Sequence, residues 1–202
     1  MSILIEQATK ADIESCAKIL ANAFKGDLVV ADIVPGKHNR VQRLTIMFSA
    51  IMRTTALHNG VIDIAREAAD KPIIGVAIWE NPEKSTNLWA EIREIPNFLK
   101  AIGIRNIVSA LSVLKIFKKY RPSEKHWYLS DIAVSPDARG LGVGSALLEY
   151  RLNKIDKTAL PAYLESTTDS NRRLYERYGF KKVDTIELTT VNASAMLRFE
   201  NT

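Results

Sequence analysis

The chain has 202 residues, of which 47% are hydrophobic and 25% charged, and its formal net charge is +5. This length and composition predict one globular domain, residues 1–202, with a core of normal size. They exclude a disulfide-stabilised framework, because Cys16 is the only cysteine, and they favour a reducing, cytoplasmic location. No segment has the pattern of a secretory signal, and none is apolar enough to span a bilayer.

Charge and histidine content narrow the ligands that we expect. A net charge of +5 suits an anionic ligand as well as it suits nucleic acid. His38, His58 and His126 are scattered without metal-ligand spacing, so we expect no metal site. Cys16 lies in a helical pattern and is expected to be a small buried residue rather than a nucleophile.

The first half of the chain is predicted to contain a strand, two helices and a hairpin. The ranges are a strand at 4–9, a helix from the Thr9 cap to Gly26, a loop at 27–39, a helix at 40–57, and strands at 61–67 and 71–81. Gly75 interrupts the second hairpin strand, which indicates a bulge or a close approach of another backbone.

The second half alternates helices and strands. The ranges are a helical region at 88–121 divided near Gly103, a strand at 126–134, a helix to about 157, a strand at 161–167, a helix at 170–180, and strands at 181–190 and 193–200. Gly179 is expected to end the last helix in a left-handed conformation. This order predicts an α/β (α+β) fold, with a mixed sheet flanked by helices.

The helical region at about 88–121 is expected to be the variable part of the domain. Its segment "IVSALSVLKIFKKYR" is apolar with a basic end. It predicts either a helix that covers a ligand pocket or a surface helix that contacts a membrane or a partner. Apolar helical spacing usually means core, so we favour the pocket. Trp79, Trp89 and Trp127 could line that pocket or simply pack in the core.

The stretch "VSPDARGLGVGSALLEY", residues 134–150, joins a strand to a helix through three alternating glycines. The first turn of a helix has amide N–H groups without partners, and its dipole favours negative charge there. Glycines let a phosphate approach these amides closely, and Arg139 adds a cation. The spacing fits neither the dinucleotide fingerprint nor the nucleoside-triphosphate loop, because no glycine follows at the required position and no Gly-Lys-Ser/Thr is present.

These residues resemble the signature loop of the GNAT superfamily of acetyltransferases, whose pattern is Arg or Gln, two residues, Gly, one residue, then Gly or Ala. Arg139, Gly142 and Gly144 match it. A second signature, Asn-x-x-x-Tyr-x-x-x-Gly-Phe, is matched by "NRRLYERYGF" at 171–180. Within the superfamily the chain looks most like the puromycin N-acetyltransferase-type branch, in "AFKGD", "VAIWENPE" and the two signature regions. The resemblance implies a splayed sheet of about six to seven strands.

The resemblance also implies acetyl-CoA as cosubstrate and assigns residues to it. The pyrophosphate is expected on the backbone amides of residues 140–145, and the pantetheine arm on the backbone of the preceding strand. The expected cofactor-binding residues are Ile132, Ala133, Val134, Arg139, Gly140, Leu141, Gly142, Val143, Gly144, Ser145, Asn171 and Tyr175. The family places the Tyr175 hydroxyl near the thioester sulfur, where a phenol that is protonated at neutral pH can donate to the departing thiolate.

The base that deprotonates the amine has two candidates. Glu165 lies on the strand at 161–167, where a partly buried carboxylate could act directly or through water. His126 is expected on the same strand face as Tyr128 and Ser130, with Asp131 on the opposite face. Both Glu165 and His126 could instead be structural polar residues.

Three functions compete on this sequence. The first is an enzyme that transfers an acetyl group from acetyl-CoA to the primary amine of a small molecule, or of a peptide or protein, by direct attack in a ternary complex. The second is a sensor that binds acetyl-CoA without turnover. The third, a nucleic-acid binder, is disfavoured by the mild charge and the lack of an aromatic–basic pattern. We expect no membrane partner, and since many family members form dimers, the resemblance admits a homodimer.

Overall fold

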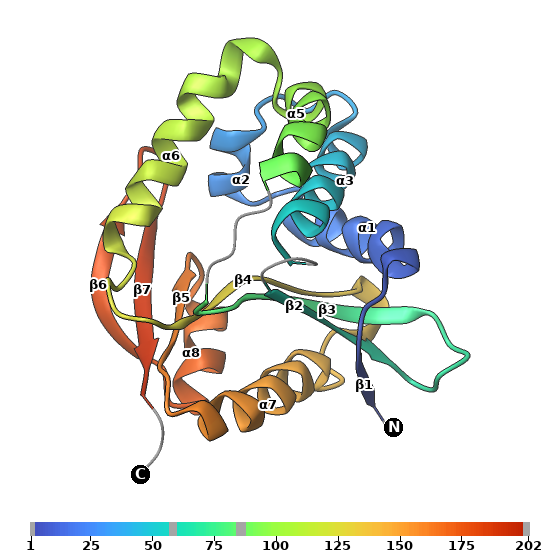
Figure 1. Ribbon diagram of the computed structural model, residues 1–202, viewed down its shortest axis with the longest axis vertical. Coiled ribbons are helices and arrows are strands. Elements are labelled where there is room, and N and C mark those ends of the chain that lie inside the picture. The colour runs from blue at the N-terminus through green and yellow to red at the C-terminus, as the bar shows by residue number, and fades with distance from the viewer. Residues whose placement is uncertain (1–2, 57–59, 84–87, 200–202) are drawn as a thin grey trace.

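The computed structural model describes residues 3–56, 60–83 and 88–199. A seven-stranded sheet forms the centre, in the order β1-β2-β3-β4-β5-β7-β6 (Figure 1). Neighbouring strands are antiparallel except β4 and β5, which are parallel. The strands are β1 (Leu4–Gln7), β2 (Gly60–Arg66), β3 (Ile73–Glu80), β4 (Trp127–Val134), β5 (Ala162–Ser166), β6 (Lys181–Glu187) and β7 (Asn192–Arg198). The predicted mixed sheet is confirmed.

Helices cover both faces of the sheet. α1 and α3 lie on one face, α7 on the other, and α8 beside β5 (Figure 1). Their bounds are α1 (Ile13–Phe24), α2 (Leu28–Ile33), α3 (Arg40–Ile51), α5 (Leu88–Ile102), α6 (Ile107–Tyr120), α7 (Val143–Ile155) and α8 (Asp169–Arg177). Because both faces are covered, the central strands are predominantly apolar rather than alternating.

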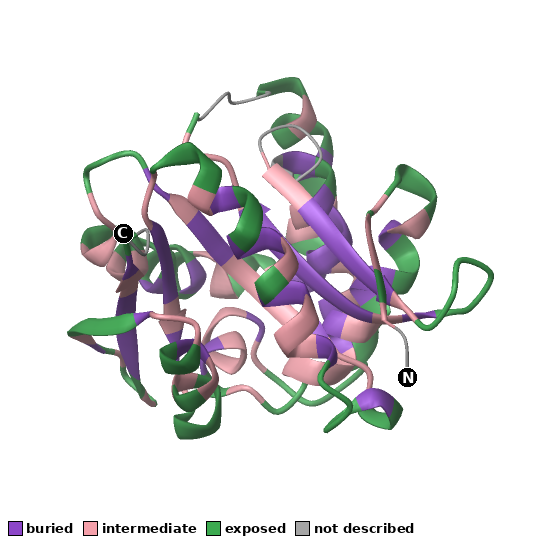
Figure 2. Ribbon diagram, turned by 90° about the horizontal axis from the view of Figure 1, so that it is seen from below, coloured by how far each residue is buried: buried purple, intermediate pink, exposed green. Residues whose placement is uncertain are grey.

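Strand β3 shows how the core is divided. Val76 and Ile78 pack with α1 and α3, whereas Ala77 and Trp79 pack on the side of α7. All four side chains are fully buried, and Figure 2 shows buried residues running along the central strands. This two-sided burial fixes α1 and α7 relative to β3, and therefore relative to the glycine loop at the start of α7.

Two local predictions have clear outcomes. Thr9 is the N-cap at the start of the first helical segment, as predicted, and its amide and hydroxyl both donate to the Asp12 carboxylate at 2.9 and 2.8 Å. The predicted loop at 27–39 is wrong, because it contains the helix α2. Asp27 accepts a hydrogen bond from the Val30 amide at 2.9 Å and starts that helix. A six-residue helix is too short to show a helical period.

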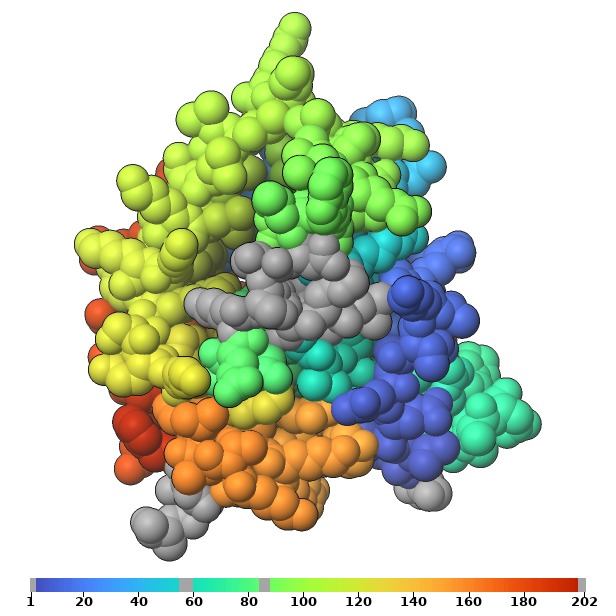
Figure 3. Space-filling model, viewed as in Figure 1, coloured from blue at the N-terminus to red at the C-terminus, as the bar shows by residue number. Residues whose placement is uncertain are grey.

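The helical region divides at Gly103, as predicted, where φ is +83°. Arg43 of α3 fastens the end of α5, since its guanidinium donates to the carbonyls of Ala101 and Ile102 at 2.8 and 3.3 Å. Figure 3 shows α5 and α6, in green and yellow, forming much of one outer surface. No helix in the described ranges is both long and apolar enough to cross a bilayer.

Gly75 marks a close approach rather than an ordinary strand position. A Cβ on this residue would lie 2.6 Å from Val143 Cγ1 and 3.1 Å from Leu147 Cδ1, both on α7. The absence of a side chain therefore lets the first turn of α7 rest directly on β3.

We predict that Gly75→Ala destabilises the protein by about 1–3 kcal/mol, because the added methyl group must displace α7 from the sheet. The matched control is Gly26→Ala, where an added Cβ would meet nothing within 4 Å. Thermal and urea unfolding of the two variants measures the difference. Equal stability of the two variants would show that α7 does not need this close approach.

Candidate active site

Strands β4 and β5 are paired over only part of their length. Three residue pairs join them, from Trp127 with Ala162 to Leu129 with Leu164, and β4 then continues to Val134 without this neighbour. Beyond Leu164, β5 pairs only with β7 on its other side. The sheet therefore splays open, as the family resemblance implies, and leaves one edge of β4 exposed within it.

The direction of the free backbone groups on β4 follows from alternation along the strand. The Ser135 amide donates to the Ile74 carbonyl of β3 at 2.8 Å. Because backbone groups alternate in direction along a strand, Val134 and Ile132 present theirs to the open side. These are the two residues expected to pair with an extended ligand arm.

The glycine loop lies at the end of this open edge. Gly140 and Gly142 have φ of +78° and +80°, and Gly142 is the N-cap of α7. The amides of Gly140, Gly142, Val143, Gly144 and Ser145 have no hydrogen-bond partner among the described residues. We call these five amides the phosphate cradle, because free N–H groups at a helix N-terminus bind anions. The predicted Leu141 amide does not belong to it, since it donates to the Ala138 carbonyl at 3.4 Å.

A cleft of about 770 Å³ runs from the cradle along the open edge of β4. Nine of the predicted site residues line it, namely Ile132, Ala133, Val134, Arg139, Gly140, Gly144, Glu165, Asn171 and Tyr175. Leu141, Gly142, Val143 and Ser145 are not among its described lining residues. The Val143 side chain is buried in the core under α7, so only its backbone is left for a ligand.

A bulge in β4 changes which side chains enter the site. Ile78 of β3 faces Asp131, and Trp79 faces Leu129, so Ser130 is an extra residue between them. A bulge of one residue reverses the alternation beyond it. Asp131 therefore lies on the same face as Tyr128, and the predicted opposite orientation of Asp131 is wrong. The two adjacent polar residues within an apolar strand were the sequence signal for this irregularity.

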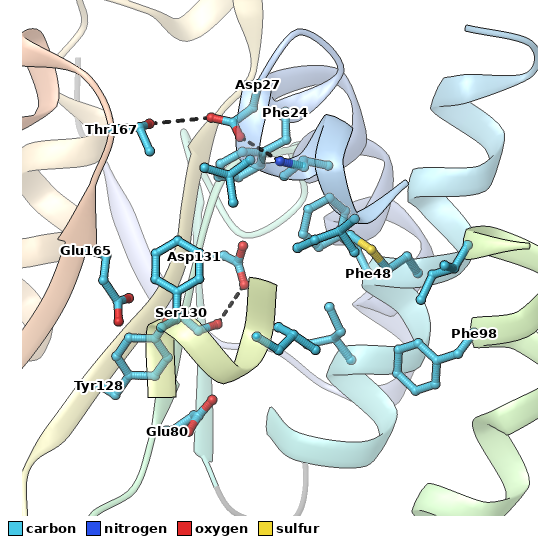
Figure 4. Close-up of a pocket in the computed structure, with 18 of the residues that line it drawn as sticks. Phe24, Asp27, Phe48, Glu80, Phe98, Tyr128, Ser130, Asp131, Glu165 and Thr167 are labelled. Atoms are coloured by element: carbon cyan, nitrogen blue, oxygen red, sulfur yellow. Dashed lines mark hydrogen bonds between the residues drawn. The ribbon is translucent and has the colours of Figure 1, made fainter. Parts of the chain in front are cut away.

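A second cavity, of about 390 Å³, opens on the helical side of the bulge (Figure 4). Its walls include Phe98 of α5 and Phe117 of α6, so the helical region 88–121 covers a pocket, as predicted. The cavity and the cleft share six lining residues, namely Phe24, Asp27, Ser130, Asp131, Glu165 and Thr167. A molecule in one can therefore meet a molecule in the other at these residues.

Glu165 is the most perturbed carboxyl group at this junction. Burial raises its pKa from 4.5 to about 7, against the opposing effect of the Arg121 guanidinium. Arg121 Nε lies 3.9 Å from Glu165 Oε1, too far for a hydrogen bond, and neither atom has a hydrogen-bond partner among the described residues. A buried acceptor without a partner is a place where a substrate or a water molecule can bind.

Asp131 is a second carboxyl group at the junction, and sequence reasoning missed it. Burial raises its pKa from 3.8 to about 6, while the Ser130 hydroxyl donates to it at 2.6 Å and opposes that rise. In the part of the chain that the structure describes, no group of three or more His, Cys, Asp or Glu side chains is arranged to hold a metal ion.

Tyr175 of α8 lines the cleft together with Asn171, one helical turn earlier. Its ring packs against Phe180 with ring centres 6.0 Å apart, and burial raises the pKa of its phenol above the ordinary value of 10. The phenol therefore keeps its proton at neutral pH and can act as a donor into the cleft.

The structure places His126 outside both cavities, which agrees with the structural alternative that the sequence left open. His126 is buried, with its ring edge against Tyr163, and Nδ1 lies 2.7 Å from the Glu124 carbonyl. This packing is that of a structural histidine, so we do not retain it as the base. Nor do the tryptophans line the pocket, since Trp79 is buried in the core, Trp127 packs there, and Trp89 is 83% exposed.

Comparison with known proteins identifies the fold. Residues 101–182 match the family model of the acetyltransferase (GNAT) domain. This part of the chain is therefore similar to a GNAT acetyltransferase domain. The whole chain superposes on a Corynebacterium glutamicum structure described as "histone acetyltransferase HPA2 and related acetyltransferase", with a TM-score of 0.78, 28% identity, and coverage of 100% of this chain and 98% of that one.

Two further relatives extend the comparison of the GNAT domain. An uncharacterized N-acetyltransferase of Schizosaccharomyces pombe is 26% identical over 197 residues, which cover 92% of this chain and 77% of that protein. The PaiA N-acetyltransferase of Thermoplasma acidophilum, solved in complex with coenzyme A, matches with a TM-score of 0.58 and 13% identity over 98% of this chain and 99% of that one. This last likeness concerns the fold alone.

The GNAT fold generally uses acetyl-CoA, and the residues present fit that molecule. The cradle supplies free amides for a pyrophosphate, and added Cβ atoms at Gly140 and Gly142 would meet no protein atom within 4 Å. The open edge of β4 offers the hydrogen bonds of a missing strand to the amide groups of a pantetheine arm. Both features have backbone groups without hydrogen-bond partners in the described part of the chain, and this ligand would supply those partners.

We predict that Gly142→Asp weakens binding of coenzyme A more than about tenfold. A carboxylate at the N-cap accepts hydrogen bonds from the first-turn amides and repels the pyrophosphate. Gly142→Asn is the matched control, because it adopts the left-handed conformation and caps the helix without a charge. Titration calorimetry with coenzyme A should give the affinity order Gly, Asn, Asp. Equal affinities of the three proteins would place the pyrophosphate elsewhere.

Proposed function

We propose that the enzyme transfers the acetyl group of acetyl-CoA to the primary amine of a small molecule, by direct attack within a ternary complex. The observation that carries this proposal is the junction of the cleft and the apolar cavity at Asp27, Asp131 and Glu165. A donor in the cleft and an amine in the cavity would meet there, beside Asp131 and Glu165, whose raised pKa values suit them to accept a proton.

Binding of the donor is assigned to the backbone of β4 and α7. The cradle amides and Arg139 would hold the pyrophosphate, and the free groups of Ile132 and Val134 would hold the pantetheine arm. Asn171 and Tyr175 would flank that arm from α8. These contacts fix the thioester at the junction, because the arm can pair with β4 in only a few registers.

The proton steps are assigned to Glu165 and Tyr175. An aliphatic amine has a pKa near 10 and arrives as an ammonium ion. It loses one proton through Glu165 to solvent, and its lone pair then forms the C–N bond with the thioester carbonyl carbon. The nitrogen loses its second proton as the C–S bond breaks, and the thiolate receives a proton from Tyr175, which is then reprotonated. The products are one amide, one thiol and one released proton.

Direct attack is preferred to an acyl-enzyme because no cysteine is among the described residues that line the junction. Cys16, the only cysteine, lies on the buried face of α1, and burial raises its pKa to about 12. An enzyme is also favoured over a sensor, since a sensor would not need Glu165 and Tyr175 on either side of the junction. The buried free thiol further supports our proposal of a cytoplasmic location.

Placement within the superfamily is proposed from sequence alone. Four stretches, "AFKGD", "VAIWENPE" and the two signature regions, support a position near the puromycin N-acetyltransferase-type branch. The antibiotic substrate of that branch is not part of the proposal.

We predict that Glu165→Gln lowers kcat by about 10²-fold or more, because the amine loses its proton acceptor. In the unchanged enzyme, activity at saturating amine should rise with pH through about 7, where the buried carboxyl group ionises, and this limb should disappear in the variant. Release of coenzyme A, followed with a thiol reagent, measures both effects. If the limb survives in Glu165→Gln but is lost in Asp131→Asn, the base is Asp131.

We predict that Tyr175→Phe lowers kcat about 10²-fold and changes KM for acetyl-CoA by less than about threefold, since the hydroxyl acts on the departing thiolate. Tyr150→Phe is the matched control, because Tyr150 lies on α7 and lines neither cavity. Steady-state kinetics at several pH values test this. Unchanged turnover in Tyr175→Phe would remove the acid role.

A further inference from the structure

The apolar cavity has polar side chains on one side only. Figure 4 shows Asp27, Asp131, Glu165 and Glu80 on the side of the strands, and Phe48 and Phe98 on the opposite, helical side. The described helical residues that line the cavity are all apolar, and they include Val29, Ile33, Met47, Phe48, Phe98 and Ile102. A volume of about 390 Å³ is at the small end for ligand sites, so it fits a compact molecule.

Most of the charged side chains that line the cavity are acidic. Its described lining residues carry four carboxyl groups and one guanidinium, that of Arg121. This guanidinium is already engaged, with Nη1 3.2 Å from Glu80 Oε2 and its centre 3.6 Å from the centre of the Tyr128 ring. The remaining carboxyl groups lie at the junction with the cleft. They would attract one cation there and repel an anion.

We propose that the acceptor is a small primary monoamine with an apolar body, such as an arylalkyl or branched alkyl amine, and no second charge. Its ammonium group lies by Asp27, Asp131 and Glu165, and its body lies against the wall of Phe48 and Phe98. A second ammonium group would face that wall without a partner, and a carboxylate would face the acidic junction, so each is penalised.

This inference rests on the proposed acetyl transfer for its kinetic readout, and matched pairs of amines test it. Heptylamine differs from 1,6-diaminohexane by a methyl group in place of an ammonium group. 2-Phenylethylamine differs from phenylalanine by the lack of a carboxylate. We expect kcat/KM to be on the order of 100-fold higher for the monoamine in each pair. Equal or better use of the diamine, of phenylalanine or of a lysine-containing basic peptide would overturn the inference.

A substitution in the apolar wall tests the same proposal by changing the protein instead of the amine. Phe98→Asp gives the wall a carboxylate, so it should reduce the preference for heptylamine over 1,6-diaminohexane at least tenfold. Trp89→Asp is the matched control on the same helix, because Trp89 is 83% exposed and outside the cavity, and it should leave the preference unchanged. If Phe98→Asp does not fold, Phe98→Ala should shift the preference toward bulkier monoamines.

Failure of the proposed function can be told apart from failure of the inference. Calorimetry with the same amines and the complex of enzyme and coenzyme A measures occupancy of the cavity without turnover. Binding of the monoamines without acetylation would overturn the transfer but support the assigned ligand class. Acetylation that prefers the charged partners would support the transfer and overturn the ligand class.

Discussion

The parting of β4 from β5 is the constraint on which the rest of the site depends. After three shared residue pairs, β5 continues beside β7 and β4 beside β3, so backbone groups of β4 face a gap inside the molecule. Such groups are costly unless they find a partner. α7 begins at one end of this gap with its free amides, and α8 lines its side. The opening, the phosphate cradle and the position of Tyr175 are therefore parts of one arrangement, which a ligand with amide groups and a charged end would complete.

The bulge at Ser130 lies where this opening meets the apolar cavity. Without the extra residue, the face that carries Tyr128 would next carry Ser130 and then Ile132, and Asp131 would point toward the core under α7. The shift of one position brings Asp131 to the face of the cavity instead. The same shift lets Ile132 and Val134 keep their side chains in the core of α7 while their backbone groups face the cleft. One inserted residue thus shapes both the cleft and the cavity.

The features that the sequence predicted correctly depend on residues close together in the chain. The features that it missed depend mostly on residues far apart in the chain. The alternating glycines, the Asn171–Tyr175 spacing and Gly179, whose φ is +84°, are set by neighbours in the chain, and the structure has each in the predicted element. The helix α2 was missed because six residues show no period, and the orientation of Asp131 was missed because a bulge depends on the partner strand. The closeness of Arg121 and Glu165, 44 positions apart in the sequence, depends on where α6 ends above the sheet, which no local pattern encodes.

The buried carboxyl groups explain why an apolar helical wall belongs at this site. A carboxylate with solvent around it ionises near pH 4 and would hold an ammonium ion without taking its proton. Burial is the main cause that raises the pKa values of Glu165 and Asp131 toward neutrality, and residues of α3, α5 and α6 line the cavity that these two groups also line. This burial costs folding stability, because Asp131 and Glu165 both interact with the Arg121 guanidinium, which is already shared with Glu80. In our proposal, the helical wall that selects an apolar acceptor therefore also faces the carboxyl groups that act on the acceptor's amine.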